Sequence, residues 1–170
     1  MLKLWMKLGS GHTTRFTLMD TLATAHEFDV RRVLSAIHHL TGSDYTSNVG
    51  TKYAELVSKP EHYLKNFSLV STEEDMDNSL RAAEEYLVKV VRSASMNVES
   101  KTFDQLRFAM YHFNNSGIHD LPPTSASIRL HIQRAFYNTN LQLNCLNALS
   151  KQLNPLLFGY YEENGCLFPK

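Results

Sequence analysis

Residues 36–56, AIHHLTGSDYTSNVGTKYAEL, contain the end of an apolar helical pattern, a polar loop and the start of a second helix. The pattern begins at Asp29, a favoured N-cap residue, and ends at Gly42, a residue type that commonly terminates helices. Thr51 can cap the next helix, which we expect to run through Val57. The apolar residues before Gly42 recur at the spacing of one helical face: Val30, Val33, Leu34, Ile37 and Leu40. The stretch therefore predicts a helix, a loop and a helix.

Helical signals continue on both sides of this stretch. Asp20 can cap a short helix that ends near His26, and Pro60 is placed for the first turn of another. Ser71-Thr-Glu-Glu74 has capping-box spacing and opens a predicted helix over about 71–94. Residues 102–113 form a further predicted helix, and Asn114-Asn-Ser-Gly117 ends it. Thr124 follows two prolines and caps a helix that we expect to run to about residue 149.

Strand signals are confined to the two ends of the chain. Near the start, apolar residues alternate with polar or aromatic ones, at Leu2, Leu4, Met6 and Leu8. Glycines that can form a turn follow, and residues 15–18 can form the returning strand. Residues 2–18 therefore predict a β-hairpin. Near the other end, Asn164-Gly165 is a strong two-residue hairpin signal. The chain is therefore expected to be a mainly α, multi-helix bundle with small β-hairpins near both termini.

The composition describes a chain that can fold as one domain. It has 170 residues, 43% of them apolar, with 17 Lys or Arg and 17 Asp or Glu. This length can bury a core, and zero net charge excludes binding of nucleic acid by bulk electrostatics alone. The charge is uneven: +2 over residues 1–70, −4 over 71–120 and +2 over 121–170. A local basic surface therefore remains compatible with the composition.

Two cysteines, Cys145 and Cys166, have no partner pattern for a disulfide framework or a zinc site. A reducing compartment, and so an intracellular, nuclear or cytoplasmic location, is the expectation. The N-terminal stretch is interrupted by Lys3 and Lys7, unlike a signal peptide, and no apolar run has the length of a membrane span. We therefore expect no membrane partner.

The loop after Gly42 has residue types that suit phosphate handling. Asp44 can bind a hard divalent cation through oxygen. The backbone N–H groups near Gly50 and Thr51 can meet a phosphate at a helix N-terminus, and Lys52 adds a positive charge. Other roles are open for the same residues. Asp44 can stabilise the turn after the helix, and Lys52 can be a solvated helix lysine.

This arrangement resembles a known family. Gly42-Ser-Asp-Tyr45, a loop and Gly50-Thr-Lys-x-Ala54 are similar to the helix-two-turn-helix region of PIN-like, flap-endonuclease-type nucleases. The chain more closely resembles the C-terminal half of a group of animal PIN-like proteins that are often multicopy and transposon-associated. That resemblance also rests on Leu4-Trp5, Gly9-x-Gly11 and Arg15-Phe16 near the start, and on Leu121-Pro-Pro-Thr-Ser-x-Ser127 later. The loop departs from the family pattern in having Gly50-Thr-Lys where two glycines are expected, and it is shorter.

The resemblance implies two-metal phosphodiester hydrolysis, with Asp44 as the last carboxylate of a cluster that binds Mg²⁺ or Mn²⁺. The other acidic motifs of the family belong to an N-terminal α/β portion, and this chain is expected to begin after it. We expect a single domain, 1–170. The patterns along the chain, with the resemblance, divide it into a hairpin (1–19), a helix-two-turn-helix-like region (20–67), a long-helix region (71–149) and a C-terminal hairpin (154–170).

Two functions follow as expectations. The first is a nucleic-acid-binding C-terminal part of a PIN-like nuclease, with Gly50, Thr51 and Lys52 as contacts, and without catalysis unless the N-terminal portion is supplied. The alternative is a helical protein–protein interaction module derived from such a nuclease, which would have an oligomer partner.

Several other residues have competing interpretations. His38 and His39 are adjacent, and because neighbours on a helix point about 100° apart they cannot easily bind one ion, so one of them is expected to be packed or capping. Cys145 is expected in the core. Five aromatic residues could stack on bases, but their helical spacing favours core positions: Phe103, Phe108, Phe113, Phe136 and Tyr137.

Overall fold

The computed structural model describes residues 5–8, 12, 14–18, 28–49, 59–67, 73–91, 99–113, 116–148 and 153–170. Helices dominate these residues, as predicted from the sequence. They are α2 (Phe28–Thr41), α3 (Pro60–Leu64), α4 (Glu73–Val91), α5 (Phe103–Phe113) and α6 (Ser125–Asn144), with short 3-10 turns η3 (Ile118–Asp120) and η4 (Pro155–Leu157). No helix among the described residues is both long and apolar enough to cross a bilayer.

Both predicted hairpins are confirmed. Strands β1 (Trp5–Leu8) and β2 (Arg15–Leu18) pair antiparallel. Strands β3 (Tyr160–Glu163) and β4 (Cys166–Pro169) pair in the same way through a two-residue turn. Asn164 and Gly165 form that turn with φ values of 52° and 75°. Positive φ at both central residues matches the right-handed twist of the strands, which is why this dipeptide forms the turn.

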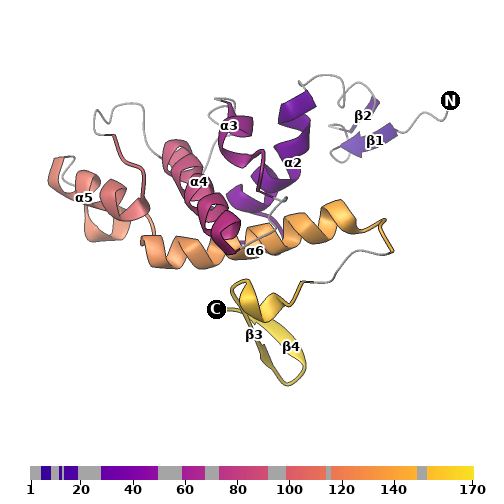
Figure 1. The fold of residues 1–170 in the computed structure, drawn as a ribbon. Helices are drawn as coiled ribbons and strands as arrows, with labels where there is room; N and C mark the ends of the chain where they lie inside the picture. Colours follow the sequence, from indigo (N-terminus) through magenta and orange to yellow (C-terminus); the bar gives the residue numbers. More distant parts are fainter. Residues whose placement is uncertain are drawn as a thin grey trace.

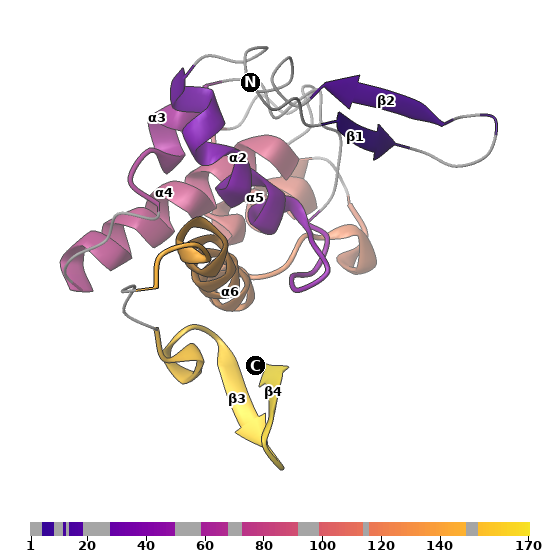
Figure 2. The same cartoon turned by 90° about the vertical axis from the view of Figure 1, so that its right-hand side faces the viewer.

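Helix α6 occupies the centre of the fold. Figures 1 and 2 show α2, α3 and α4 on one side of α6 and the β3–β4 hairpin on the other. The hairpin is attached to α6 by Arg134, whose Nη1 donates to Gly159 O and Lys170 O, both at 3.2 Å. Phe158 stacks on Phe136 of α6 with ring centroids 5.6 Å apart. Helix α6 is therefore covered on two faces.

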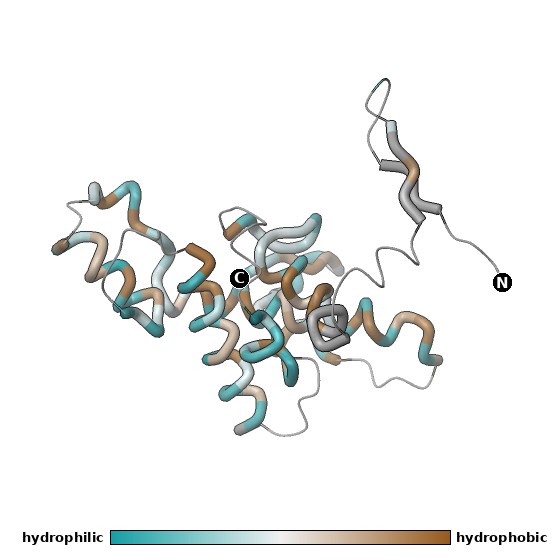
Figure 3. The backbone as a smooth tube through the Cα atoms, turned by 90° about the horizontal axis from the view of Figure 1, so that it is seen from above, coloured by the Kyte–Doolittle hydropathy of each residue, from teal (hydrophilic) through white to brown (hydrophobic). Residues whose placement is uncertain are grey.

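The core lies between α6 and the other helices. Figure 3 shows hydrophobic segments alternating with hydrophilic ones along the helices, the pattern of amphipathic helices that pack together. Each of the five described helices contributes at least one side chain that is at most 2% exposed, for example Leu40, Leu64, Leu87, Leu106 and Ile132. Helices are stabilised mainly by this kind of packing rather than by intrinsic propensity.

Local start and stop signals account for several helix boundaries. Thr124 caps α6, because its hydroxyl accepts a hydrogen bond of 3.3 Å from Ser127 N. Pro60 occupies the first turn of α3, as expected. Asp29 was expected to cap α2 but lies one residue inside it. Two predicted helices, over 20–26 and 51–57, lie outside the described residues. The capping box predicted at 71–74 lies partly outside them.

Three residues expected in the core are exposed instead. Helix α6 ends at Asn144, five residues earlier than predicted, so Cys145 follows the helix and is exposed. Phe108 is 59% exposed and Phe113 is 65% exposed. Helix α5 buries the face that contains Phe103 and Leu106, and Phe108 is two residues from Leu106, about 200° around the helix. Of the five aromatic residues, Phe103 and Phe136 are buried as expected.

Candidate functional site

The loop that follows α2 leaves the helix at Gly42. This residue has φ +129°, and a Cβ atom built on it would lie 2.8 Å from Asn48 Cα. A side chain would therefore meet both backbone strain and a backbone clash. Gly42 N donates to His38 O at 3.2 Å, and Val49 N donates to Thr41 O at 3.2 Å. The loop is thus fastened to the end of α2 at both of its ends.

A hydrogen-bond network from α2 fixes the turn of the loop. Ser43 and Thr46 exchange backbone hydrogen bonds of 3.2 Å in each direction. Thr46 Oγ1 donates to His39 O at 2.7 Å, and Ser43 Oγ lies 3.0 Å from His39 Nδ1. The other ring nitrogen of His39 lies 3.1 Å from Gln142 Oε1 of α6. Because that oxygen only accepts, Nε2 carries the proton, and Nδ1 accepts from Ser43.

His39 is therefore the packed histidine that its position beside His38 led us to expect. Its side chain is buried, whereas His38 is exposed. Burial lowers the pKa of His39, although the hydrogen bond with Gln142 acts in the opposite direction. The neutral ring is the form that this network requires.

The tip of the turn presents Asp44 and Tyr45 to solvent. Both side chains are exposed, and the ring of Tyr45 is 69% exposed. Within the described part of the chain, no three His, Cys, Asp or Glu side chains form a group that could hold a metal ion. The described residues alone therefore do not make the carboxylate cluster that two Mg²⁺ or Mn²⁺ ions require. Gly50, Thr51 and Lys52 lie outside the described residues.

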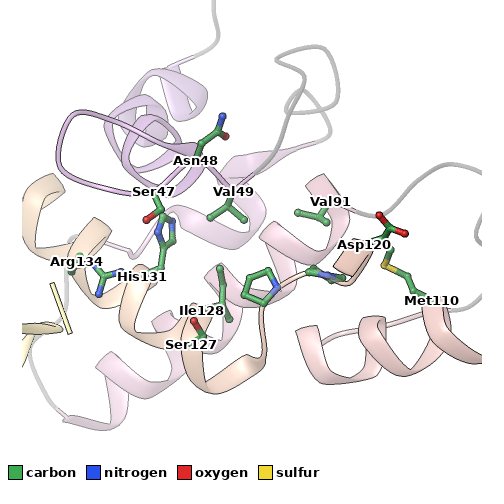
Figure 4. Close-up of a pocket in the computed structure, with 12 residues that line it drawn as sticks. Ser47, Asn48, Val49, Val91, Met110, Asp120, Ser127, Ile128, His131 and Arg134 are labelled. Carbon is green, nitrogen blue, oxygen red and sulfur yellow. The ribbon is translucent and has the colours of Figure 1, made fainter. Parts of the chain in front are cut away.

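A pocket of about 330 Å³ lies against the second half of the same loop. Figure 4 shows the residues that line it. Ser47, Asn48 and Val49 come from the loop, and Ser127, Ile128, His131 and Arg134 come from α6. The remaining lining residues are Val91, Met110, Asp120, Pro122 and Pro123. This volume falls in the lower part of the range of small-molecule sites in proteins.

His131, which lines this pocket, has a buried ring nitrogen without a hydrogen-bond partner among the described residues. Its side chain is 3% exposed, and its Nε2 lies 2.8 Å from Leu40 O. A carbonyl only accepts, so Nε2 carries the proton and the Nδ1 of the neutral ring has a free lone pair. Nδ1 is buried and has no hydrogen-bond partner among the residues described. Burial lowers the pKa of His131, which favours this neutral state.

Arg134 brings a buried positive charge to the same end of the pocket. It is 7% exposed, and burial lowers the pKa of its guanidinium group. The described hydrogen bonds of the guanidinium group are those that Nη1 donates to Gly159 O and Lys170 O of the C-terminal hairpin segment. In the described part of the chain, no Asp or Glu lies within ion-pair distance of it. Figure 4 shows Arg134, His131 and Ser47 at one end of the lining and Asp120 with Met110 at the other.

Sequence reasoning found the loop but not the pocket. A weak signal was present, because His131 and Arg134 are polar residues on the face of α6 that also contains the buried Ile128 and Ala135. Polar residues on a buried face need partners, so they are worth noticing. The sequence could not show that this face would meet Ser47 and Val49, which are about 80 residues away.

Exposed aromatic side chains form a second feature, on α5. Phe108, Tyr111, His112 and Phe113, here called the α5 aromatic cluster, are all exposed. The centroids of Phe108 and His112 are 4.2 Å apart, and those of Phe108 and Phe113 are 6.5 Å apart. His112 also contacts Tyr111, with centroids 5.3 Å apart. The four rings thus form one connected aromatic surface.

Comparison of the chain with protein-family models, with curated proteins and with solved structures gave no match.

Proposed function

We propose that this chain binds nucleic acid through the loop that begins at Gly42, as the C-terminal part of a PIN-like nuclease. The observation that carries the proposal is the rigid presentation of the loop. Hydrogen bonds from His39, and the backbone bond between Val49 and Thr41, hold the loop in one conformation. A preorganised loop loses little conformational entropy when it binds, so more of the contact energy appears as affinity.

Tyr45 is the residue on this loop best suited to contact a base. Its ring is 69% exposed at the tip of the turn, where it can stack on an unpaired base. Lys52 follows on the same segment and would contact phosphate, as the resemblance implies. Lys59 and Lys65, both exposed, add positive charge nearby in the sequence. We therefore favour a single-stranded or locally unpaired strand as the ligand.

Hydrolysis is proposed only for an assembly that includes an N-terminal α/β portion. Asp44 is one exposed carboxylate, and two divalent ions need several oxygen ligands. In such an assembly Asp44 would contribute one ligand to Mg²⁺ or Mn²⁺, whose role is to activate water and stabilise the leaving oxygen. In isolation the chain would bind without cleaving.

Fluorescence anisotropy with labelled single- and double-stranded DNA and RNA tests this proposal, at about 50 mM and about 200 mM salt. We expect affinity to fall as salt rises. Tyr45→Ala should weaken binding of single strands by about 1–3 kcal/mol. Lys52→Ala should reduce the slope of log affinity against log salt by about one.

Tyr161→Ala is the matched control, because Tyr161 is also an exposed tyrosine but lies on β3. It should bind like the unmodified chain. The absence of salt-sensitive binding at micromolar protein, or equal effects of Tyr45→Ala and Tyr161→Ala, would refute the loop as a nucleic-acid-binding element.

A second candidate function is self-assembly through the α5 aromatic cluster. Phe108 and Phe113 are 59% and 65% exposed, and connected apolar surfaces of this kind often mark interaction sites. Zero net charge means that two copies of the chain would not repel one another strongly. A second copy is therefore the partner that we propose for this surface.

Light scattering over a range of protein concentrations tests the second candidate. The chain should form a concentration-dependent oligomer, and the double variant Phe108→Ser with Phe113→Ser should be monomeric. Leu157→Ser is the control, because Leu157 is 71% exposed on η4, away from α5 in sequence. A monomer at all concentrations would count against this function.

A further inference from the structure

We infer that the pocket beside Ser47–Val49 binds one nucleobase that has left the stack of a bound strand. This inference rests on the proposed nucleic-acid binding and assigns a specific ligand class to the cavity next to the binding loop. Two sources share the chemistry of this ligand: a base within a strand, and a free nucleoside. Binding of a one-base strand and of a free nucleoside separates them.

The size of the pocket fits one ring system. A volume of about 330 Å³ lies at the lower end of the range of small-molecule sites and leaves room for one base. A single inorganic ion would leave most of it empty.

The walls of the pocket are suited to the flat faces of a base. Val49 and Ile128, which are buried, and Pro122, which is partly buried, come from three separate segments. Val91 of α4 and Met110 of α5 add further apolar surface. Bases held outside a duplex are commonly packed between apolar or aromatic side chains, with their edges left for hydrogen bonds.

The charges of the pocket favour a neutral ligand. Asp120 and Arg134 both line the pocket, and Figure 4 shows them at opposite ends of the lining. A phosphate or carboxylate seated in the pocket would gain from the guanidinium group but would be repelled by the carboxylate. A base is uncharged, so neither group repels it, and its edge can offer donors or acceptors to the polar group beside which it lies.

The polar atoms offer complementary partners for such an edge. His131 lines the pocket, and its Nδ1 is a buried acceptor without a partner among the described residues, so a small shift of the ring on binding would let an N–H group of a base restore its hydrogen bond. Ser47 and Ser127 line the pocket with hydroxyl groups, which can donate or accept. Arginine is the side chain that most often reads the acceptors of guanine, and Arg134 is present here.

The position of the pocket links it to the proposed binding loop. Tyr45 lies at the exposed tip of the loop, and Ser47 and Val49, two and four residues later, line the pocket. If a strand stacks one base on Tyr45, a neighbouring nucleotide of that strand would therefore lie close to the pocket. One loop would then position the backbone of the strand and also form part of the base site.

The test uses strands that offer only one base. A labelled single strand made of abasic nucleotides is compared with the same strand carrying one central 2-aminopurine, and binding is measured by anisotropy. The single base should tighten binding by about tenfold or more. The 2-aminopurine emission should also change as the base moves from water into an apolar pocket.

Ser127→Trp is the variant that blocks the pocket. Ser127 has an exposed side chain that lines the pocket, and only its backbone N–H takes part in the cap with Thr124. Ala126→Trp is the matched control, because Ala126 is an exposed neighbour in the same turn that does not line the pocket. Ser47→Trp blocks the pocket from the opposite wall, in case Ser127→Trp folds poorly.

We expect Ser127→Trp and Ser47→Trp to abolish the gain from the single base, and Ala126→Trp to keep it. A gain that survives both pocket variants would place the base elsewhere, for instance on Tyr45, and would overturn the inference while leaving the proposed function intact. The same conclusion follows if the abasic strand and the one-base strand bind equally.

Failure of both strands to bind would instead refute the proposed function. The free nucleoside 2-aminopurine riboside then decides the inference. If the free nucleoside binds, and Ser127→Trp removes this binding while Ala126→Trp preserves it, the result would support a nucleobase site that is filled by free nucleosides. The absence of such binding would overturn the nucleobase assignment altogether.

Discussion

Glu84 of α4 accepts a hydrogen bond of 2.6 Å from Ser125 Oγ, at the first residue of α6. The same carboxylate oxygen, Oε1, accepts a hydrogen bond of 2.9 Å from Phe103 N, at the first residue of α5. Asp104 and Ser125 complete the junction, since each accepts a hydrogen bond from the backbone N–H of the other. One side chain thus ties together three helices.

We predict that Glu84→Ala destabilises the fold by about 1–3 kcal/mol, because two donors at helix N-termini lose their acceptor. Urea unfolding measures the change. Glu85→Ala is the control, since the ion pair described for Glu85 is one of 4.0 Å with Lys89 on a partly exposed surface, and such pairs contribute little. Equal losses in the two variants would show that the junction does not stabilise the fold.

We predict that the protein loses stability as the pH falls from 7 towards 5. Burial is the main cause that lowers the pKa of both His39 and His131 in the folded protein. The unfolded chain therefore takes up protons first, near the ordinary histidine pKa of about 6.5. The two histidines therefore contribute their full stabilisation above that pH. This stabilisation is lost as the pH falls towards the pKa values that they have in the folded protein.

Thermal unfolding at about pH 7.5 and about pH 5 measures this loss. The double variant His39→Gln with His131→Gln should show a smaller difference between the two pH values. His119→Gln, at an exposed position, should keep the difference of the unmodified chain. An unchanged pH dependence in the double variant would contradict the assignment to these two residues.

We predict that Gly42→Ala is more damaging than Gly165→Ala. Both glycines have positive φ, so both variants pay a backbone cost of about 1 kcal/mol or more. Only at position 42 would the new Cβ lie 2.8 Å from Asn48 Cα, whereas a Cβ at position 165 would have nothing within 4 Å. Denaturant unfolding of both variants is the measurement. Equal destabilisation would mean that the loop relaxes freely around position 42.

We predict that Arg134→Lys loosens the C-terminal hairpin while leaving the helices folded. The guanidinium group bridges Gly159 O and Lys170 O, and an ammonium group on a flexible stem does not reproduce that geometry. Amide hydrogen exchange over 160–168 should become faster. Arg129→Lys, where the exposed Arg129 pairs with Asp77, is the control and should leave exchange in the hairpin unchanged. Unaltered exchange in Arg134→Lys would show that the ring contacts of Phe158 are enough to hold the hairpin.

Local signals in the sequence specify the structure wherever they act over only a few residues. The Thr124 cap, the Asn164-Gly165 turn and the helical start at Pro60 each depend on neighbouring backbone groups, and the structure has all three. The apolar spacing before Gly42 also predicted α2 and its end. These features follow from dihedral preferences and short-range hydrogen bonds, which need no knowledge of the rest of the fold.

The packing of the helices sets which of their faces are covered. The aromatic residues of α5 point to several sides of the helix, so periodicity could not show that Phe103 is buried and Phe108 exposed. The bond between His131 and Leu40 spans 91 residues, and that between Glu84 and Ser125 spans 41. Such contacts depend on how the helices pack against each other, which short-range patterns do not specify. The pocket beside the Gly42–Val49 loop exists for the same reason, because packing brings α6 against a loop that is distant in the sequence.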